Sequence, residues 1–206
     1  MSLSALVVAL VLAAPGPTQS PEARPAPARA DLSWEDADYV ALMLRRVDRR
    51  LRSGRRASKE TIVVTERQLN SFVNLSLAEK IPPEVSGLVL SLTQNRLGAR
   101  ASVDLDQLRP KMPEGGAGAL LSMLSGVVPV QLGGRVESAE GVLQVRLEEV
   151  MVGGVSLPPA LLAQIVSFAT RNDERPNGLD IAAPVALPFT ARQVRVEPGR
   201  ALFDFY

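Results

Sequence analysis

Three segments of the chain alternate apolar and polar residues with a period of two, and a short polar turn interrupts each of them. The segments cover residues 87–106, 129–155 and 192–206, with turns at 93–96, 139–141 and 198–199. Such alternation is typical of strands with one buried face, and a short turn between two such strands predicts a β-hairpin. Hairpin strands run antiparallel, so the sequence predicts an antiparallel meander and disfavours a parallel, Rossmann-like sheet.

The three hairpins carry apolar residues along their strands, and in the first hairpin these share one face, because successive side chains point to opposite faces. These positions are Leu88, Leu90, Leu92, Leu97, Ala99, Ala101, Val103, Leu105, Val130, Leu132, Val136, Leu143, Val145, Leu147, Val194, Val196, Leu202, Phe203 and Phe205. A further extended segment, residues 177–189, is broken by Pro184 and Pro188. Since proline cannot donate to a strand ladder, this segment is expected at a sheet edge.

Residues 31–60 are expected to contain an Arg-rich helix. Ser33 and Asp36 resemble a capping box, with Asp in place of the usual Glu. Apolar residues then recur at helical spacing as far as Arg52, namely Trp34, Val40, Leu44, Val47 and Leu51. Acidic residues open this helix and arginines close it, which complements the helix dipole.

Two interpretations of the arginines stay open. They form a solvated helix end, or they contact anionic head groups; the candidates for that contact are Arg49, Arg50, Arg52, Arg55 and Arg56. Nucleic acid is disfavoured as a partner, because no aromatic residues are interleaved with the arginines. The 23 basic and 22 acidic side chains of the chain also nearly cancel.

A second helix is expected to begin at Thr65, with Gln68 at the capping-box position, and to end at Pro82. A strand at 61–64 precedes it. Leu69, Phe72, Val73 and Leu77 form its apolar stripe, with Ser76 inside the stripe and Asn70 and Asn74 on the flank.

A third helix follows Pro158 and Pro159, with an apolar stripe made by Leu161, Leu162, Ile165, Val166, Phe168 and Ala169. Residues 119–124 are expected to form a short helix or a mobile loop. Together the elements predict an α+β fold, a long antiparallel β-meander with two or three helices against one face.

The N-terminus carries an apolar run from Leu3 to Ala14. It is too short to span a bilayer comfortably, and it has the length of a signal-peptide core. Residues 1–14 are therefore expected to be a signal peptide or an N-terminal anchor, and the Pro/Ala-rich residues 15–30 a linker. The expected location is the periplasm or the outer face of the inner membrane, with residues 61–206 as the folded α+β domain.

No catalytic constellation is visible in the sequence. Without His or Cys, Ser-His-Asp sites, Cys-His sites and the metal sites built on these residues are excluded. Asp104 and Asp106 are expected on the same face of one strand, and Glu148 and Glu149 on opposite faces. Solvated strand edges explain these carboxylates better than a facing catalytic pair. We therefore expect no enzyme, no catalytic residue, no metal and no cofactor.

Three short motifs resemble secreted bacterial domains of the YpmS and LmeA type. They are T-E-x-Q-L-N-x-F at residues 65–72, V-G-G-V-x-L-P at 152–158, and L-P-F followed by V-x-V-x-x-G-x-A-L at 187–202. Such domains are similar to the TULIP (tubular lipid-binding) superfamily. The resemblance implies a half-barrel in which a curled sheet wraps a helix and holds lipid chains, and it carries over no catalytic residue.

The sequence thus predicts an exported cell-envelope protein that binds or carries a lipid, or another apolar small molecule, in an apolar groove. The predicted lining is Leu69, Phe72, Val73, Leu77, Leu161, Leu162, Ile165 and Val166. Membrane-surface contact is possible on this hypothesis, and the sequence names no protein partner. The alternative is a structural or interaction module of the envelope whose core is solid and holds no ligand.

Overall fold

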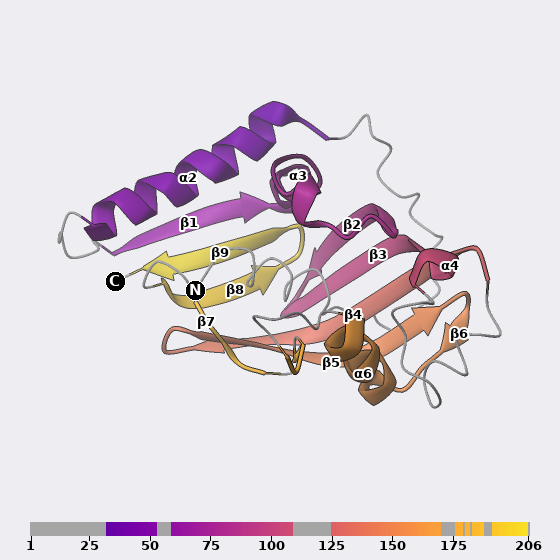
Figure 1. Ribbon diagram of the computed structural model, residues 1–206. Coiled ribbons are helices and arrows are strands. Elements are labelled where there is room, and N and C mark those ends of the chain that lie inside the picture. Colours follow the sequence, from indigo (N-terminus) through magenta and orange to yellow (C-terminus); the bar gives the residue numbers. More distant parts are fainter. Residues whose placement is uncertain are drawn as a thin grey trace.

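The computed structural model describes residues 32–52, 59–108, 125–169, 176–178, 180–181, 183–187 and 191–205 (Figure 1). Within them the chain forms two antiparallel sheets and several helices, so the predicted α+β class is confirmed. The suggested helix at 119–124 lies outside the described residues.

The larger sheet is an open meander of six strands. Five strands follow one another in the order β2 (Val85–Thr93), β3 (Arg96–Asp104), β4 (Val127–Ala139), β5 (Val142–Val152) and β6 (Val155–Ser156). The sixth, β7 (Val185–Ala186), pairs with Val142 and Leu143 of β5. The first two predicted hairpins are therefore present, and the proline-broken segment supplies a two-residue strand.

The smaller sheet joins the two ends of the folded region. Its order is β1 (Glu60–Thr65), β9 (Arg200–Phe205) and β8 (Ala191–Glu197). The hairpin β8–β9 is the third predicted one, and its turn uses Gly199 at φ +74°, a conformation that favours glycine. Strand β1 pairs along its whole length with β9, from Glu60 opposite Phe205 to Thr65 opposite Arg200.

Backbone and hydroxyl groups from the turn end of the large sheet cap the outer edge of β8. Asn95 N–H donates to the carbonyl of Val196 at 2.9 Å, and Gly141 N–H donates to that of Arg192 at 2.7 Å. Between them, Val194 N–H donates to Ser138 Oγ at 2.9 Å. The two sheets are thus joined at one corner, and the β8–β9 hairpin lies between β1 and the large sheet (Figure 1).

The helices are short except for the first. They are α2 (Trp34–Arg52), α3 (Glu66–Ser71), the π-helix η2 (Phe72–Ser76), the 3₁₀ turn η3 (Ala78–Lys80), α4 (Leu105–Leu108) and α6 (Pro159–Ala169). The N-terminal helix ends at Arg52 as predicted. Trp34, one of the apolar residues at helical spacing, is 63% exposed. At 100° per residue Trp34 lies well away from Val40 and Val47, which are buried.

One face of the large sheet, its inner face, carries two hydrophobic clusters. The first cluster includes Leu88, Leu90, Leu92, Leu97, Ala99, Val136, Leu143 and Val145 from the sheet, with Val40, Val47, Val64, Leu69, Phe72, Val73, Val194, Val196, Ala201 and Phe205 above them. The second includes Leu105, Val128, Val150, Val152, Leu157, Leu162, Val166 and Ile181. Residues directly opposite each other on neighbouring strands share a face, and the register runs from Leu90 to Ala99, Leu132 and Val150.

The sheet does not curl into the half-barrel expected from the resemblance. Over one part of its inner face the apolar positions are buried by α2, α3, η2 and the small sheet, and over the other part by α6. Because separate elements cover the two parts, the sheet can bury its apolar positions without closing on itself.

Two details of the strands differ from the prediction. Strand β3 ends at Asp104, so Leu105 and Asp106 belong to α4, and Asp104 Oδ1 accepts hydrogen bonds from the N–H groups of Asp106 and Gln107. A β-bulge shifts the β4–β5 register between Gly133 and Gly134. Because a bulge interrupts the alternation, Glu148 and Glu149 are both exposed and do not point to opposite faces.

Candidate functional site

The predicted capping box fixes the start of α3. Gln68 N–H donates to Thr65 Oγ1 at 3.2 Å, and Thr65 N–H donates to Gln68 Oε1 at 2.9 Å. This cap places the apolar stripe of the helix over the first cluster, where Leu69, Phe72 and Val73 are buried and Leu77 is half-buried. The predicted Ser76 is exposed.

Three polar side chains of α3 and η2 hold this helix against the edge of β2. Glu66 Oε2 accepts from Leu92 N–H at 2.7 Å. Asn70 accepts from Leu90 N–H at 2.7 Å and donates to the Leu90 carbonyl at 2.8 Å. Asn74 donates to the carbonyl of Leu88 at 2.9 Å. Glu66, Asn70 and Asn74 are called the edge-capping side chains below.

The spacing of the edge-capping side chains matches the strand. Every second residue of β2 turns its backbone groups to this edge, about 7 Å apart, and four residues of an α-helix rise about 6 Å. Four residues also rotate about 40° beyond a full turn. The π-helical turn of η2, in which Leu77 N–H donates to the Phe72 carbonyl, contains more residues than an α-helical turn. Four residues in it rotate by less than a full turn, which offsets the extra rotation of the α-helix.

Sequence reasoning placed Asn70 and Asn74 on the flank of the helix but missed this role. The detectable signal is their spacing of four residues beside an apolar stripe.

The predicted lining on α6 lies elsewhere. Leu162 and Val166 are buried in the second cluster, and Leu161 packs against it half-buried. The Ile165 side chain is outside the described part of the structure. The structure therefore divides the predicted lining residues between two clusters.

Five half-buried apolar side chains lie between the clusters, all on the inner face of the large sheet. They are Ala101, Val103, Val130, Leu132 and Leu147, and they are called the apolar seam below. Leu132 and Leu147 pack against both clusters. Most of the seam comes from β3 and β4, which are interior strands of the sheet, where full burial of apolar side chains is usual. Sequence analysis identified these residues as strand residues without assigning them to a site.

Only some of the arginines predicted to contact head groups lie in the described part of the structure. Arg49 is exposed on α2. Arg50 and Arg52 belong to the same helix, but their side chains are outside the described set, and Arg55 and Arg56 lie outside the described residues altogether.

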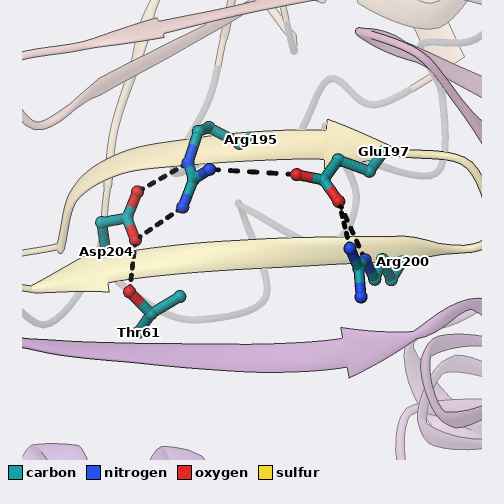
Figure 2. A network of polar contacts seen from close by, with 5 residues as sticks. All are labelled: Thr61, Arg195, Glu197, Arg200 and Asp204. Atoms are coloured by element: carbon teal, nitrogen blue, oxygen red, sulfur yellow. Dashed lines mark hydrogen bonds and ion pairs between the residues drawn. The ribbon is translucent and has the colours of Figure 1, made fainter.

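A polar network crosses the three strands of the small sheet, on the opposite face from the first cluster (Figure 2). Thr61 Oγ1 donates to Asp204 Oδ1 at 2.7 Å, and Arg195 Nε donates to Asp204 Oδ2 at 2.9 Å. Arg195 also forms an ion pair with Glu197 at 3.8 Å, and Arg200 donates to Glu197 at 2.9 Å and 2.7 Å.

The network stabilises the ionised form of Asp204. The hydrogen bond from Arg195 lowers the pKa of this carboxyl below its usual value, and the Thr61 hydroxyl adds to the effect, while burial opposes it. Each carboxylate in Figure 2 is paired with a guanidinium group. The network therefore joins the three strands of the small sheet through paired charges and the Thr61 hydrogen bond.

Two other carboxylates singled out in the sequence, Asp104 and Glu148, also have structural partners. The pKa of Asp104 is lowered by the hydrogen bonds of Gln107, from its side chain first and its backbone second. Glu148 forms ion pairs with Arg96 and with Arg135 on the outer face of the sheet. Among the described residues, no group of acidic side chains is arranged to hold a metal ion.

Comparison of the chain with protein-family models, curated proteins and solved structures finds no match. The resemblance to YpmS, LmeA and TULIP domains therefore stays a prediction. None of the helices in the described ranges combines the length and apolarity needed to cross a membrane.

Proposed function

We propose that the protein binds an apolar small molecule, such as a lipid acyl chain, at the apolar seam, and that it catalyses no reaction. The supporting observation is the incomplete burial of Leu132 and Leu147 between two well-buried clusters. A solid core would cover apolar positions on interior strands, whereas a bound acyl chain would complete the cover in the holo form.

The proposal alters the predicted lining. Leu69 of α3 and Phe72 and Val73 of η2 fill the first cluster and would form a wall behind the ligand. Leu161, which is half-buried, and the seam residues would touch it directly. Export to the cell envelope remains part of the proposal, because that is where the N-terminal apolar run would direct the chain.

The test is a pair of substitutions at neighbouring residues of β4. Leu132 is half-buried on the inner face, and Gln131 is exposed on the outer face. Leu132→Trp fills the seam and is expected to weaken binding of a fluorescent fatty acid, whereas Gln131→Trp adds the same ring outside and leaves binding unchanged. Native mass spectrometry of wild-type protein from bacterial envelopes is expected to show a bound lipid.

Two results would refute the proposal. If wild-type protein neither carries a lipid nor binds the fatty acid, the half-buried seam is part of a solid core. Equal loss of binding in both variants would place the probe outside the seam. Either result favours the alternative function, an interaction module of the cell envelope that holds no ligand.

A further inference from the structure

Helix α2 has one fixed inner face. Ala37 is fully buried, and Val40 and Val47 belong to the first cluster. Polar contacts with α3 hold the helix as well: Ser33 N–H donates to Ser71 Oγ at 3.1 Å, and Arg67 pairs with the nearly buried carboxylate of Asp36 at 3.0 Å. The opposite face of α2 is therefore held towards solvent.

That outer face is unusually apolar for an exposed surface. Trp34 is 63% exposed, Leu42 is 58% exposed and Tyr39 is 40% exposed. At 100° per residue these three side chains fall within an arc of about 140°. Large apolar side chains gathered on one exposed face mark an interaction site more often than an inert surface.

Arginines share the same arc. Arg45, Arg46 and Arg49 are exposed, and the helical rotation places them between Trp34 and Tyr39 around the axis. The sequence continues with Arg50, Arg52, Arg55 and Arg56. Two acidic residues of the face, Glu35 and Asp38, lie in the first turns, so the positive charge is concentrated at the other end.

We propose that the outer face of α2 docks the protein onto an anionic lipid bilayer. Trp and Tyr rings favour the bilayer interface, where one part of the ring is apolar and another polar. Arginine can extend its apolar stem while its guanidinium group pairs with lipid phosphates. Leu42, between the acidic and basic ends, would enter the head-group region. This docking is independent of ligand binding at the apolar seam.

The chain offers two site-specific reporters for the test. Trp34 is its one tryptophan, and it has no cysteine, so a single introduced cysteine can be labelled uniquely. With vesicles of phosphatidylglycerol and phosphatidylcholine in about equal amounts, Trp34 emission is expected to shift to shorter wavelength. Phosphatidylcholine vesicles alone are expected to give no shift, and about 0.5 M salt should reverse the shift because it screens exposed charges.

Two matched controls show which surface is involved. A polarity-sensitive dye on Leu42→Cys is expected to brighten with the anionic vesicles, whereas the same dye on Gln131→Cys, on the outer face of the large sheet, stays unchanged. Replacing Arg45, Arg46 and Arg49 by Gln is expected to lower vesicle partitioning by about tenfold or more. Replacing Arg135, Arg146 and Arg200 by Gln, which removes the same formal charge elsewhere, should lower it far less.

The proposal is overturned if Trp34 emission does not respond to anionic vesicles, and the outer face is then available to a protein partner. It is also overturned if the two triple Arg→Gln variants lose vesicle partitioning equally, or if the dye brightens equally at positions 42 and 131. Circular dichroism of each variant verifies that the fold is retained. Trp34 and the dye at position 42 both lie on α2, so they report docking of this face, whereas the fatty-acid assay reports binding at the apolar seam.

Discussion

The side-chain amide of Asn70 pairs with both backbone groups of Leu90, as a neighbouring strand would. Its Oδ1 accepts from Leu90 N–H at 2.7 Å, and its Nδ2 donates to the Leu90 carbonyl at 2.8 Å. The same Nδ2 donates to the carbonyl of Glu66 within the helix at 2.9 Å. Asn70 is buried, so its contacts are shielded from water. A helix thereby covers the edge of the large sheet, which would otherwise be open to pairing with another chain.

Replacing Asn70 by Ala is expected to destabilise the protein by about 3 kcal/mol, because the buried backbone groups of Leu90 lose their partners. Asn74→Ala is the matched control. Asn74 is half-buried and donates one hydrogen bond to the strand, so its loss is expected to cost about 1 kcal/mol. Urea unfolding measures both free energies.

Amide hydrogen exchange gives a local readout for the same pair of variants. In Asn70→Ala, the Leu90 amide is expected to lose its protection from hydrogen exchange, whereas the amide of Ala99, on the next strand, stays protected. Equal stability of Asn70→Ala and wild type would show that water replaces the Asn70 side chain without loss.

The strands and helix starts could be predicted because their causes are local. Alternation with a period of two sets each hairpin, and the Thr65–Gln68 capping box sets the start of α3. The position of Asn70 beside β2 is not local, because it requires knowledge of which strand forms the sheet edge. Trp34 is exposed although it is apolar, because its position around the helix axis lies well away from the buried Val40 and Val47.

Thr65→Ala is expected to destabilise the protein by about 1 kcal/mol, since the Gln68 amide loses the hydroxyl that caps the helix. Thr65→Ser keeps the hydroxyl and should lose much less. The free energy of unfolding in urea gives the comparison. If the two variants lose the same amount, the threonine methyl group contributes the stability and the cap contributes nothing.

Gly134→Ala is expected to cost about 2 kcal/mol, because a new methyl group would lie 2.6 Å from the Arg146 carbonyl oxygen and 2.8 Å from Val145 Cγ1. The backbone of β5 would have to move. Gly98→Ala, on β3, is the control: its methyl group would meet the Ser91 hydroxyl, a side-chain group that can rotate away. Thermal unfolding should therefore separate the two variants, and an equal loss would contradict this distinction.

The candidate site was less predictable than the fold. Helical periodicity correctly identified Leu162 and Val166 as inward-facing, but it could not show that they belong to a different cluster from Phe72. That separation depends on the register of the whole sheet, including the bulge at Gly133 and Gly134. Leu132 and Leu147 acquire their place between the clusters only from this register, so no local pattern distinguishes them from other strand residues.

Asp204 is expected to make stability depend on pH. Its pKa is lowered in the folded state, chiefly by the hydrogen bond from Arg195. A carboxyl group with a lowered pKa in the folded state contributes stability at pH values above its unfolded-state pKa of about 4. This contribution is lost as the pH falls through the lower folded-state pKa. Asp204→Asn is therefore expected to cost about 1–2 kcal/mol near pH 7, and the difference from wild type should shrink below about pH 4.

Urea unfolding of the two proteins between about pH 7 and pH 2 measures this dependence. Glu197→Gln is the control on the same sheet, because its partners Arg195 and Arg200 are exposed and surface ion pairs contribute little. Its difference from wild type should stay small at every pH. A difference for Asp204→Asn that is unchanged in acid would mean that Asp204 stabilises the strands through its shape and not its charge, since asparagine can still accept the Thr61 hydrogen bond.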